Sequence, residues 1–128
     1  MSRIMLVDDD HDAVFALKFV LESYDYEVDG FTDPNLALNN FVRGLYDLIL
    51  IDIKMPSLNG FELYKLLKRK DYAANICFVT AGETKYHKVK DVADSDKCLR
   101  KPISNSELLD YAAKAIKNPQ EITNLCIN

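Results

Sequence analysis

Three acidic side chains follow apolar runs in which an unpaired charge would be costly. Asp8 and Asp9 come directly after IMLV (4–7), and Asp52 comes directly after LILI (48–51). A carboxylate at the end of a buried strand loses hydration free energy unless a partner holds it. Three carboxylates brought together also repel one another, and each is pushed toward protonation unless a cation shares the site. The sequence therefore predicts a shared cation.

Magnesium is the cation that these residues suit best. It prefers oxygen ligands, takes one or two carboxylates and keeps several waters. A nitrogen- or sulfur-preferring metal is disfavoured, because no cysteine or histidine pair has a ligand spacing. A carboxylate beside Mg²⁺ and a lysine is also a plausible nucleophile toward phosphorus, and the product would be an acyl phosphate.

Two further polar residues stand after apolar runs. Thr80 follows ICFV (76–79), and Lys101 follows a short strand that we expect at residues 97–100. Thr80 could donate a hydrogen bond to a phosphoryl oxygen, and Lys101 could pair with another oxygen as a point charge. Taken singly, an aspartate after a strand is usually a turn residue or a helix cap, and a lone threonine or lysine means little. Their joint placement at successive strand ends favours the functional interpretation.

The elements that must position these residues alternate along the chain. The three apolar runs are continuous, as in parallel strands covered on both faces, whereas the stretch around Val28 and Phe31 alternates with acidic residues and reads as an edge strand. Between the strands lie segments of helical period, including a fourth helix at about residues 83–92 with a thin apolar stripe. Asp33 before Pro34 predicts one helix start. Two further helix starts are predicted, with Asp10 as a cap and with Ser104 and Glu107 as a capping box. The predicted apolar helix faces are Val14, Leu17 and Leu21; Phe61 or Leu63 with Leu66 and Leu67; and Leu108, Leu109, Ala112, Ala113 and Ile116.

Five strands alternating with five helices predict a doubly wound α/β domain, with a parallel sheet, right-handed crossovers and helices on both faces. In such sheets ligands bind beyond the carboxyl ends of the strands, which is where the polar residues above converge.

Composition bounds the function class. The 128 residues suit one domain, and 48% apolar with 28% charged residues is a globular profile. The net charge of −4 argues against sequence-independent nucleic-acid binding. The apolar start is too short for a signal peptide or a membrane span. Cys77, Cys98 and Cys126 are odd in number, which favours reduced thiols in a cytoplasm, with the first two in the core.

With these residues in place, the chain resembles the receiver domain of two-component response regulators. The matching segments are IMLVDDD, LILIDIKMPSLNG, FVTA and LRKP, in the family's order and spacing. The resemblance implies a flavodoxin-like sheet of strand order 2-1-3-4-5. It also implies a phospho-accepting signalling domain rather than an enzyme, which assists its own phosphorylation and dephosphorylation. Its expected partners are a sensor histidine kinase or phosphotransfer protein and a downstream protein of unstated identity, with no nucleic acid and no membrane.

The resemblance also assigns roles residue by residue. It makes Asp52 the phospho-acceptor and Mg²⁺ the cofactor. The remaining roles are a direct metal ligand (Asp9), a ligand through water (Asp8), a backbone carbonyl ligand (Lys54), the hydroxyl that senses the phosphoryl group (Thr80), the small neighbour that gives access (Ala81), and a lysine that pairs with the phosphoryl group (Lys101), whose bond to Pro102 is expected to be cis. Met55-Pro56 and Gly60 fit the loop after the phosphorylation site.

One position departs from the family pattern. Cys98 stands where the family has a Tyr or Phe that rotates when the threonine moves, and a thiol cannot fill the same volume. The departure keeps open a receiver-like interaction module that signals without phosphorylation. A phosphatase or mutase with an aspartyl nucleophile is disfavoured, because Lys54 occupies the place of its second aspartate. A flavin or dinucleotide binder would need a phosphate-cradling loop where VDDDHD stands.

The remaining expectations concern the outer segments. We expect the receiver domain at residues 1–118 and a C-terminal tail at 119–128, too short for an output domain, so the chain is a stand-alone receiver or a fragment. His11 is expected to lie exposed in a first helical turn. The run KYHKVK (85–90), with His87, is equally consistent with a solvated helix face and with partner docking.

Overall fold

The computed structural model describes residues 1–80 and 98–117. Its elements alternate along the chain as the sequence predicts. In order they are β1 (Arg3–Val7), α1 (His11–Glu22), β2 (Glu27–Phe31), α2 (Pro34–Asn40), β3 (Leu48–Asp52), α3 (Gly60–Lys70), β4 (Ile76–Thr80), β5 (Cys98–Arg100) and α5 (Asn105–Lys117). The fourth helix expected at about 83–92 and the KYHKVK run lie outside the described residues.

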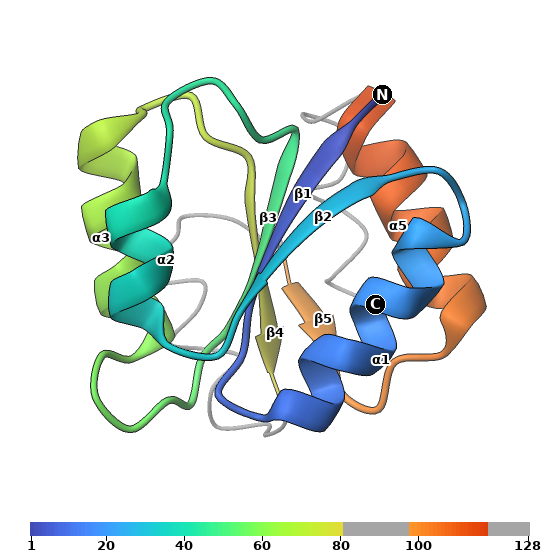
Figure 1. Ribbon diagram of the computed structural model, residues 1–128, viewed down its shortest axis with the longest axis horizontal. Coiled ribbons are helices and arrows are strands. Elements are labelled where there is room, and N and C mark those ends of the chain that lie inside the picture. Colours follow the sequence, from blue (N-terminus) through green and yellow to red (C-terminus); the bar gives the residue numbers. More distant parts are fainter. Residues whose placement is uncertain (81–97, 118–128) are drawn as a thin grey trace.

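The strands form one parallel sheet of order β2-β1-β3-β4-β5, which confirms the predicted fold class and strand order. The edge position expected for the strand around Val28 is confirmed as β2. Register aligns Val7 of β1 with Ile51 of β3, so the residues that follow, Asp8 and Asp52, lie side by side. The arrowheads of β4 and β5 point toward the lower edge of Figure 1, where the carboxyl ends of the strands gather.

Helices cover both faces of the sheet, with α1 and α5 on one side and α2 and α3 on the other (Figure 1). Strand β1 shows how one short sequence serves both layers, because successive side chains of a strand point to opposite faces. Ile4 and Leu6 join a core cluster with Leu21 and Leu108, and Met5 and Val7 join a second cluster with Ala37, Leu63 and Leu67. Each fully buried aliphatic side chain of this kind stabilises the fold by roughly 1.5–3 kcal/mol.

The predicted helix starts are confirmed. The Asp33 side chain accepts a hydrogen bond from the Asn35 N–H, with Pro34 in the first turn. Ser104 and Glu107 form the reciprocal capping box: the Glu107 N–H donates to Ser104 Oγ at 3.1 Å, and the Ser104 N–H donates to Glu107 Oε1 at 3.4 Å.

The buried stripe of α5 differs from the predicted one. Leu108 and Ala112 are buried as expected, but Tyr111 and Ala115 are also fully covered, while Leu109, Ala113 and Ile116 are half-buried. Apolar residues occur on more than one face of this helix. Helical period alone therefore predicts a buried face that is shifted by about one residue from the observed one. Val14 and Leu21 of α1 are buried and His11 is exposed, as predicted.

Over the two described stretches, none of the helices has the length and apolar character needed to span a membrane.

Candidate functional site at the carboxyl ends of the strands

Lys101 brings the acidic residues of β1 and β3 together. Its ammonium Nζ lies 2.9 Å from Asp8 Oδ2 and 3.5 Å from Asp52 Oδ1. Both carboxylates are almost fully buried, at 4% exposed for Asp8 and 6% for Asp52. Asp52 is the last residue of β3 rather than the first residue after it, and Lys101 directly follows β5. The ammonium thus joins the central strands to the far edge of the sheet.

Asp9 completes an acidic cluster with Asp8 and Asp52. One carboxylate oxygen from each residue lies within 4.8 Å of the others, and Asp9 is the exposed member. A donor set made only of carboxylate oxygens suits a hard divalent cation such as Mg²⁺. The cluster therefore fits the predicted cofactor in its chemistry.

Burial and like charge act together on Asp52. Burial and the neighbouring charge of Asp8 raise the pKa of its carboxyl group, Lys101 partly opposes both effects, and the resulting pKa is about 6. Burial would lower the pKa of Lys101, but its hydrogen bond to Asp8 and the charges of Asp52 and Asp8 outweigh burial, and the pKa is raised. A further cation would therefore stabilise the charged form of the Asp52 carboxylate.

The two oxygens of Asp8 already have partners. Oδ1 accepts a hydrogen bond of 3.0 Å from the Asp10 N–H, and Oδ2 is paired with Lys101. The backbone N–H of Asp8 is fixed as well, because it donates to the Phe31 carbonyl at the end of β2. Asp10 itself accepts from the first amides of α1, at Asp12 and Ala13, which confirms its predicted role as a helix cap.

Gly60 is a part of this site whose role sequence reasoning missed. Its N–H donates to the Ile53 carbonyl at 2.9 Å, and a Cβ at this position would lie only 2.5 Å from the carbonyl oxygen of Asp52. The amino end of α3 therefore rests directly on the backbone of the expected acceptor. The sequence predicts a loop position for the glycine of MPSLNG, but it does not show which backbone segment packs against that glycine.

A largely apolar groove opens beside Lys101. It has a volume of about 410 Å³ and lies between α1 and the turn after β5, where the Lys101–Pro102 bond is cis as predicted. It is lined by Asp10, Ala13, Ala16, Leu17, Lys101, Pro102 and Ile103. On α1 itself, the aromatic side chains of Phe15 and Phe19 are 74% and 66% exposed. The small residues Ala13 and Ala16 were not singled out by sequence reasoning, since alanines in a helix are unremarkable without their neighbours.

Other predicted site residues are placed only in part. Thr80 ends β4 and Cys98 begins β5, but their side chains lie outside what the structure describes, as does Ala81. Lys54 is exposed, and the assignment of its carbonyl stays a prediction. Cys77 is fully buried, as expected of a core residue.

The sequence matches a protein family described as the response regulator receiver domain, over residues 4–113. The transcriptional regulatory protein DltR of Streptococcus agalactiae is 32% identical over 108 residues, which are 84% of this chain and 48% of that protein. The response regulator ArlR of Staphylococcus saprophyticus is 31% identical over 110 residues, 85% of this chain and 50% of ArlR. The chain thus spans about half the length of these curated relatives.

Solved structures agree with this match. The response regulator TrrA of Thermotoga maritima, in complex with Mg(2+)-BeF, has a TM-score of 0.78 and 32% identity, covering 89% of this chain and 98% of that one. The non-phosphorylated HemR receiver domain of Leptospira biflexa has a TM-score of 0.80 and 27% identity, covering 91% and 94%. Together with the sheet order and the acidic edge, these matches lead to one conclusion: the chain belongs to the receiver domains of two-component response regulators.

Proposed function

We propose that Asp52 accepts a phosphoryl group from a phospho-histidine of a sensor histidine kinase or phosphotransfer protein, in a Mg²⁺-dependent reaction that switches partner binding. The observation that carries the proposal is the position of Lys101 Nζ between Asp8 and Asp52, with Asp9 in the same cluster. Such a site combines a buried carboxylate nucleophile with a fixed cation for the transferring group.

The proposed transfer is a displacement at phosphorus. An Asp52 carboxylate oxygen forms a bond to phosphorus while the P–N bond of the donor breaks, and the electron pair returns to the imidazole nitrogen. Lys101 would pair with a phosphoryl oxygen, and Thr80 would donate a hydrogen bond to another. The small side chain of Ala81 would leave the approach open. The product is an acyl phosphate on Asp52, and the same groups would assist its hydrolysis.

The proposed metal ligands are those that the family resemblance implies. Asp9 and Asp52, with the backbone carbonyl of Lys54, would hold Mg²⁺ directly. Both oxygens of Asp8 are engaged by Lys101 and the Asp10 N–H, which supports a role through water. When bound, the metal would neutralise charge on the transferring phosphoryl group. We place the receiver unit at residues 1–118 and a tail at 119–128; the family match over residues 4–113 lies within the first range.

Intact-mass analysis with acetyl phosphate tests the chemistry. The wild-type protein should gain one phosphoryl group in Mg²⁺ and none in EDTA, and Asp52→Asn should gain none in either. Asp110→Asn is the matched control, since Asp110 is an exposed α5 residue that pairs with Lys114 one turn away. Equal modification of wild type and Asp52→Asn, or no modification of the wild type in Mg²⁺, contradicts the proposal and favours an interaction module that signals without phosphorylation.

The apolar groove beside Lys101 would receive the donor protein, because Lys101 also contacts the acceptor Asp52 and the groove lining includes the small side chains of Ala13 and Ala16. Ala16→Glu should therefore slow transfer from a phosphorylated donor protein about tenfold, the scale of a central interface residue, while leaving acetyl phosphate chemistry intact. Ala73→Glu, an exposed alanine before β4, is the control. Equal loss with both donors would show that the substitution damages the acceptor site itself. Beryllofluoride, the probe in the TrrA complex, would report whether the Mg²⁺-dependent acyl phosphate state forms here.

A further inference from the structure

The outer edge of β2 presents backbone groups that no described residue satisfies. The Glu27 N–H donates to the Ser2 carbonyl, and the Phe31 carbonyl accepts from Asp8, so these residues face β1. In a parallel ladder, alternate residues turn their N–H and C=O groups to opposite sides. Val28 and Gly30 therefore direct two N–H and two C=O groups away from the sheet. Within residues 1–80 and 98–117, no hydrogen bond to these groups is present.

A hollow of about 420 Å³ runs along this edge. Its floor is the strand from Val28 to Phe31, and its walls come from the elements on either side. The lining side chains outside the strand are Lys18 of α1 and, on the opposite side, Asn40, Leu45 and Tyr46. A slot with a strand edge as its floor has the shape that an added strand requires, rather than the closed shape of a small-molecule cavity.

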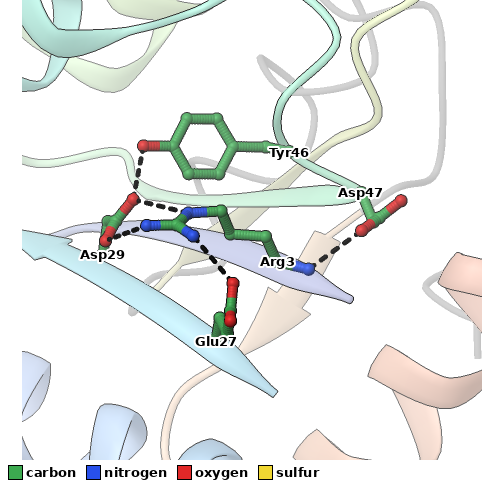
Figure 2. Close-up of polar contacts among 5 residues, drawn as sticks. All are labelled: Arg3, Glu27, Asp29, Tyr46 and Asp47. Atoms are coloured by element: carbon green, nitrogen blue, oxygen red, sulfur yellow. Dashed lines mark hydrogen bonds and ion pairs between the residues drawn. The ribbon is translucent and has the colours of Figure 1, made fainter. Parts of the chain in front are cut away.

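The two walls differ in chemistry. On the α1 side, Gly30 has no side chain; a Cβ there would lie 2.6 Å from Val14 Cγ1, which is buried, and 3.9 Å from Cδ of Lys18, which lines the hollow. On the other side, Leu45 is 40% exposed beside the Tyr46 ring. The Asp29 carboxylate on that side is not free, because it is held by Arg3 and by the Tyr46 hydroxyl (Figure 2). One wall therefore offers a positive charge and the other offers apolar surface.

We propose that the edge of β2 binds an extended segment of a partner protein as a sixth strand, with acidic side chains facing Lys18 and apolar side chains facing Leu45 and Tyr46. Side chains of a strand alternate between faces, so the segment would alternate acidic and apolar residues. A second copy of this chain fits poorly, since the carboxylates of its β2, Glu27 and Asp29, are already bonded to its own Arg3. This surface lies beside α1 and α2 and is distinct from the groove at Lys101.

Nuclear magnetic resonance with blocked five-residue peptides tests the proposal. A peptide that alternates glutamate and valine, added at millimolar concentration, should shift the Val28 and Gly30 amides and slow their hydrogen exchange at least threefold. The same peptide N-methylated at every amide keeps its side chains but has no N–H donors, and it should not bind. Absence of any shift with the unmethylated peptide, or equal shifts with both peptides, overturns the proposal.

Charge reversal tests the wall of the slot. Lys18→Glu should weaken binding of the acidic peptide about threefold and strengthen a lysine–valine peptide by a similar factor, the scale of an exposed ion pair. Lys65→Glu, an exposed α3 lysine, is the matched control and should change neither. Equal effects of both variants would overturn the assignment of Lys18. Concentration-dependent shifts of Val28 and Gly30 without peptide would identify a second copy as the occupant and overturn the partner proposal.

Discussion

The two ends of the sheet each combine three carboxylates with one basic side chain, yet a carboxyl pKa is raised at one end and lowered at the other. At the carboxyl end, Lys101 serves Asp8 and Asp52, and the pKa of Asp52 rises to about 6. At the amino end, Arg3 pairs with Asp29 and Glu27, and its backbone N–H donates to Asp47 (Figure 2). There burial would raise the pKa of Asp29, but the hydrogen bonds from Arg3 and Tyr46 outweigh burial, and the pKa is lowered.

In the part of the chain that the structure describes, the two carboxylates differ in the number of donors that reach them. Asp29 receives hydrogen bonds from two guanidinium nitrogens of Arg3 and from the Tyr46 hydroxyl, at 3.0, 3.3 and 2.7 Å. Among residues 1–80 and 98–117, the one cation beside the Asp52 carboxylate is the Lys101 ammonium at 3.5 Å, and Asp52 is almost fully buried. A satisfied carboxylate stabilises a fold, whereas an undersatisfied one costs stability and is ready to bind something else. We therefore read the amino end as structural and the carboxyl end as functional.

The largest effect should follow from breaking the amino-end network. Asp29→Ala removes three hydrogen bonds, two of them from a charged donor, and should lower the free energy of unfolding at pH 7 by about 2 kcal/mol. Because the pKa of Asp29 is lowered in the folded state, its contribution is present above its unfolded value and is lost as pH falls through the folded value. The deficit measured by urea unfolding should therefore shrink in acid.

Asp110→Ala controls for the loss of an exposed acidic residue and should change stability by less than about 0.5 kcal/mol. The rate of Asp52 phosphorylation should be unchanged in Asp29→Ala. A loss of phosphorylation without a loss of stability would overturn the division of roles between the two ends.

Asp52→Asn should act with the opposite sign. In metal-free buffer at pH 7.5 it should raise the free energy of unfolding by about 1–2 kcal/mol, because it removes a buried charge that the site does not satisfy. The folded-state pKa of about 6 lies above the unfolded value, so between about pH 4 and 6 the folded wild type binds more protons than the unfolded chain. The wild type should therefore lose stability relative to the variant as pH rises through this window. If the difference in stability between wild type and Asp52→Asn were the same at pH 4 and pH 7.5, the Asp52 charge would not be destabilised by the fold.

Tyr46→Phe sharpens the comparison by removing one donor. Burial, together with the hydrogen bond to Asp29, raises the pKa of Tyr46 to about 12. The variant should lose about 1 kcal/mol at pH 8. Since the folded-state pKa is raised, this contribution is fully present below the unfolded value near 10 and disappears as pH rises toward 12. Tyr72→Phe, at a position 89% exposed, should show neither effect. A pH-independent difference would mean that the hydroxyl does not donate to Asp29.

The smallest effect belongs to Glu27→Gln. Although its carboxylate lies 2.7 Å from Arg3, the Glu27 side chain is 48% exposed, and water competes for both partners. We expect a change in unfolding free energy below about 0.5 kcal/mol, measured by the same denaturation. A loss as large as that of Asp29→Ala would mean that charge count, rather than donor count, governs this end of the sheet.

The carboxyl end was predictable from the sequence and the amino end was not. Asp8, Asp52 and Lys101 each follow a strand-like run, and one rule about parallel sheets brings them together, although the strand order itself came from the family resemblance. Helix caps at Asp10 and Ser104 were predictable because capping is local. By contrast, Arg3 meets a partner 26 residues away, and Tyr46 meets one 17 residues away. The Arg3 contacts depend on the register of β1 with β2, and the Tyr46 contact depends also on the pairing of β3 with β1, neither of which a local pattern specifies.

The contact of Gly60 with the Asp52 backbone ties two movements together. Since no space remains between them, a displacement of the acceptor strand end must displace the start of α3, and the reverse also holds. The hydrogen bond from the Gly60 amide to the Ile53 carbonyl should therefore respond to any movement of the Asp52 backbone. Its hydrogen-exchange rate should follow the chemical state of Asp52 without any probe attached to the site. Each change in the phosphorylation state of Asp52 would then displace the first turn of α3.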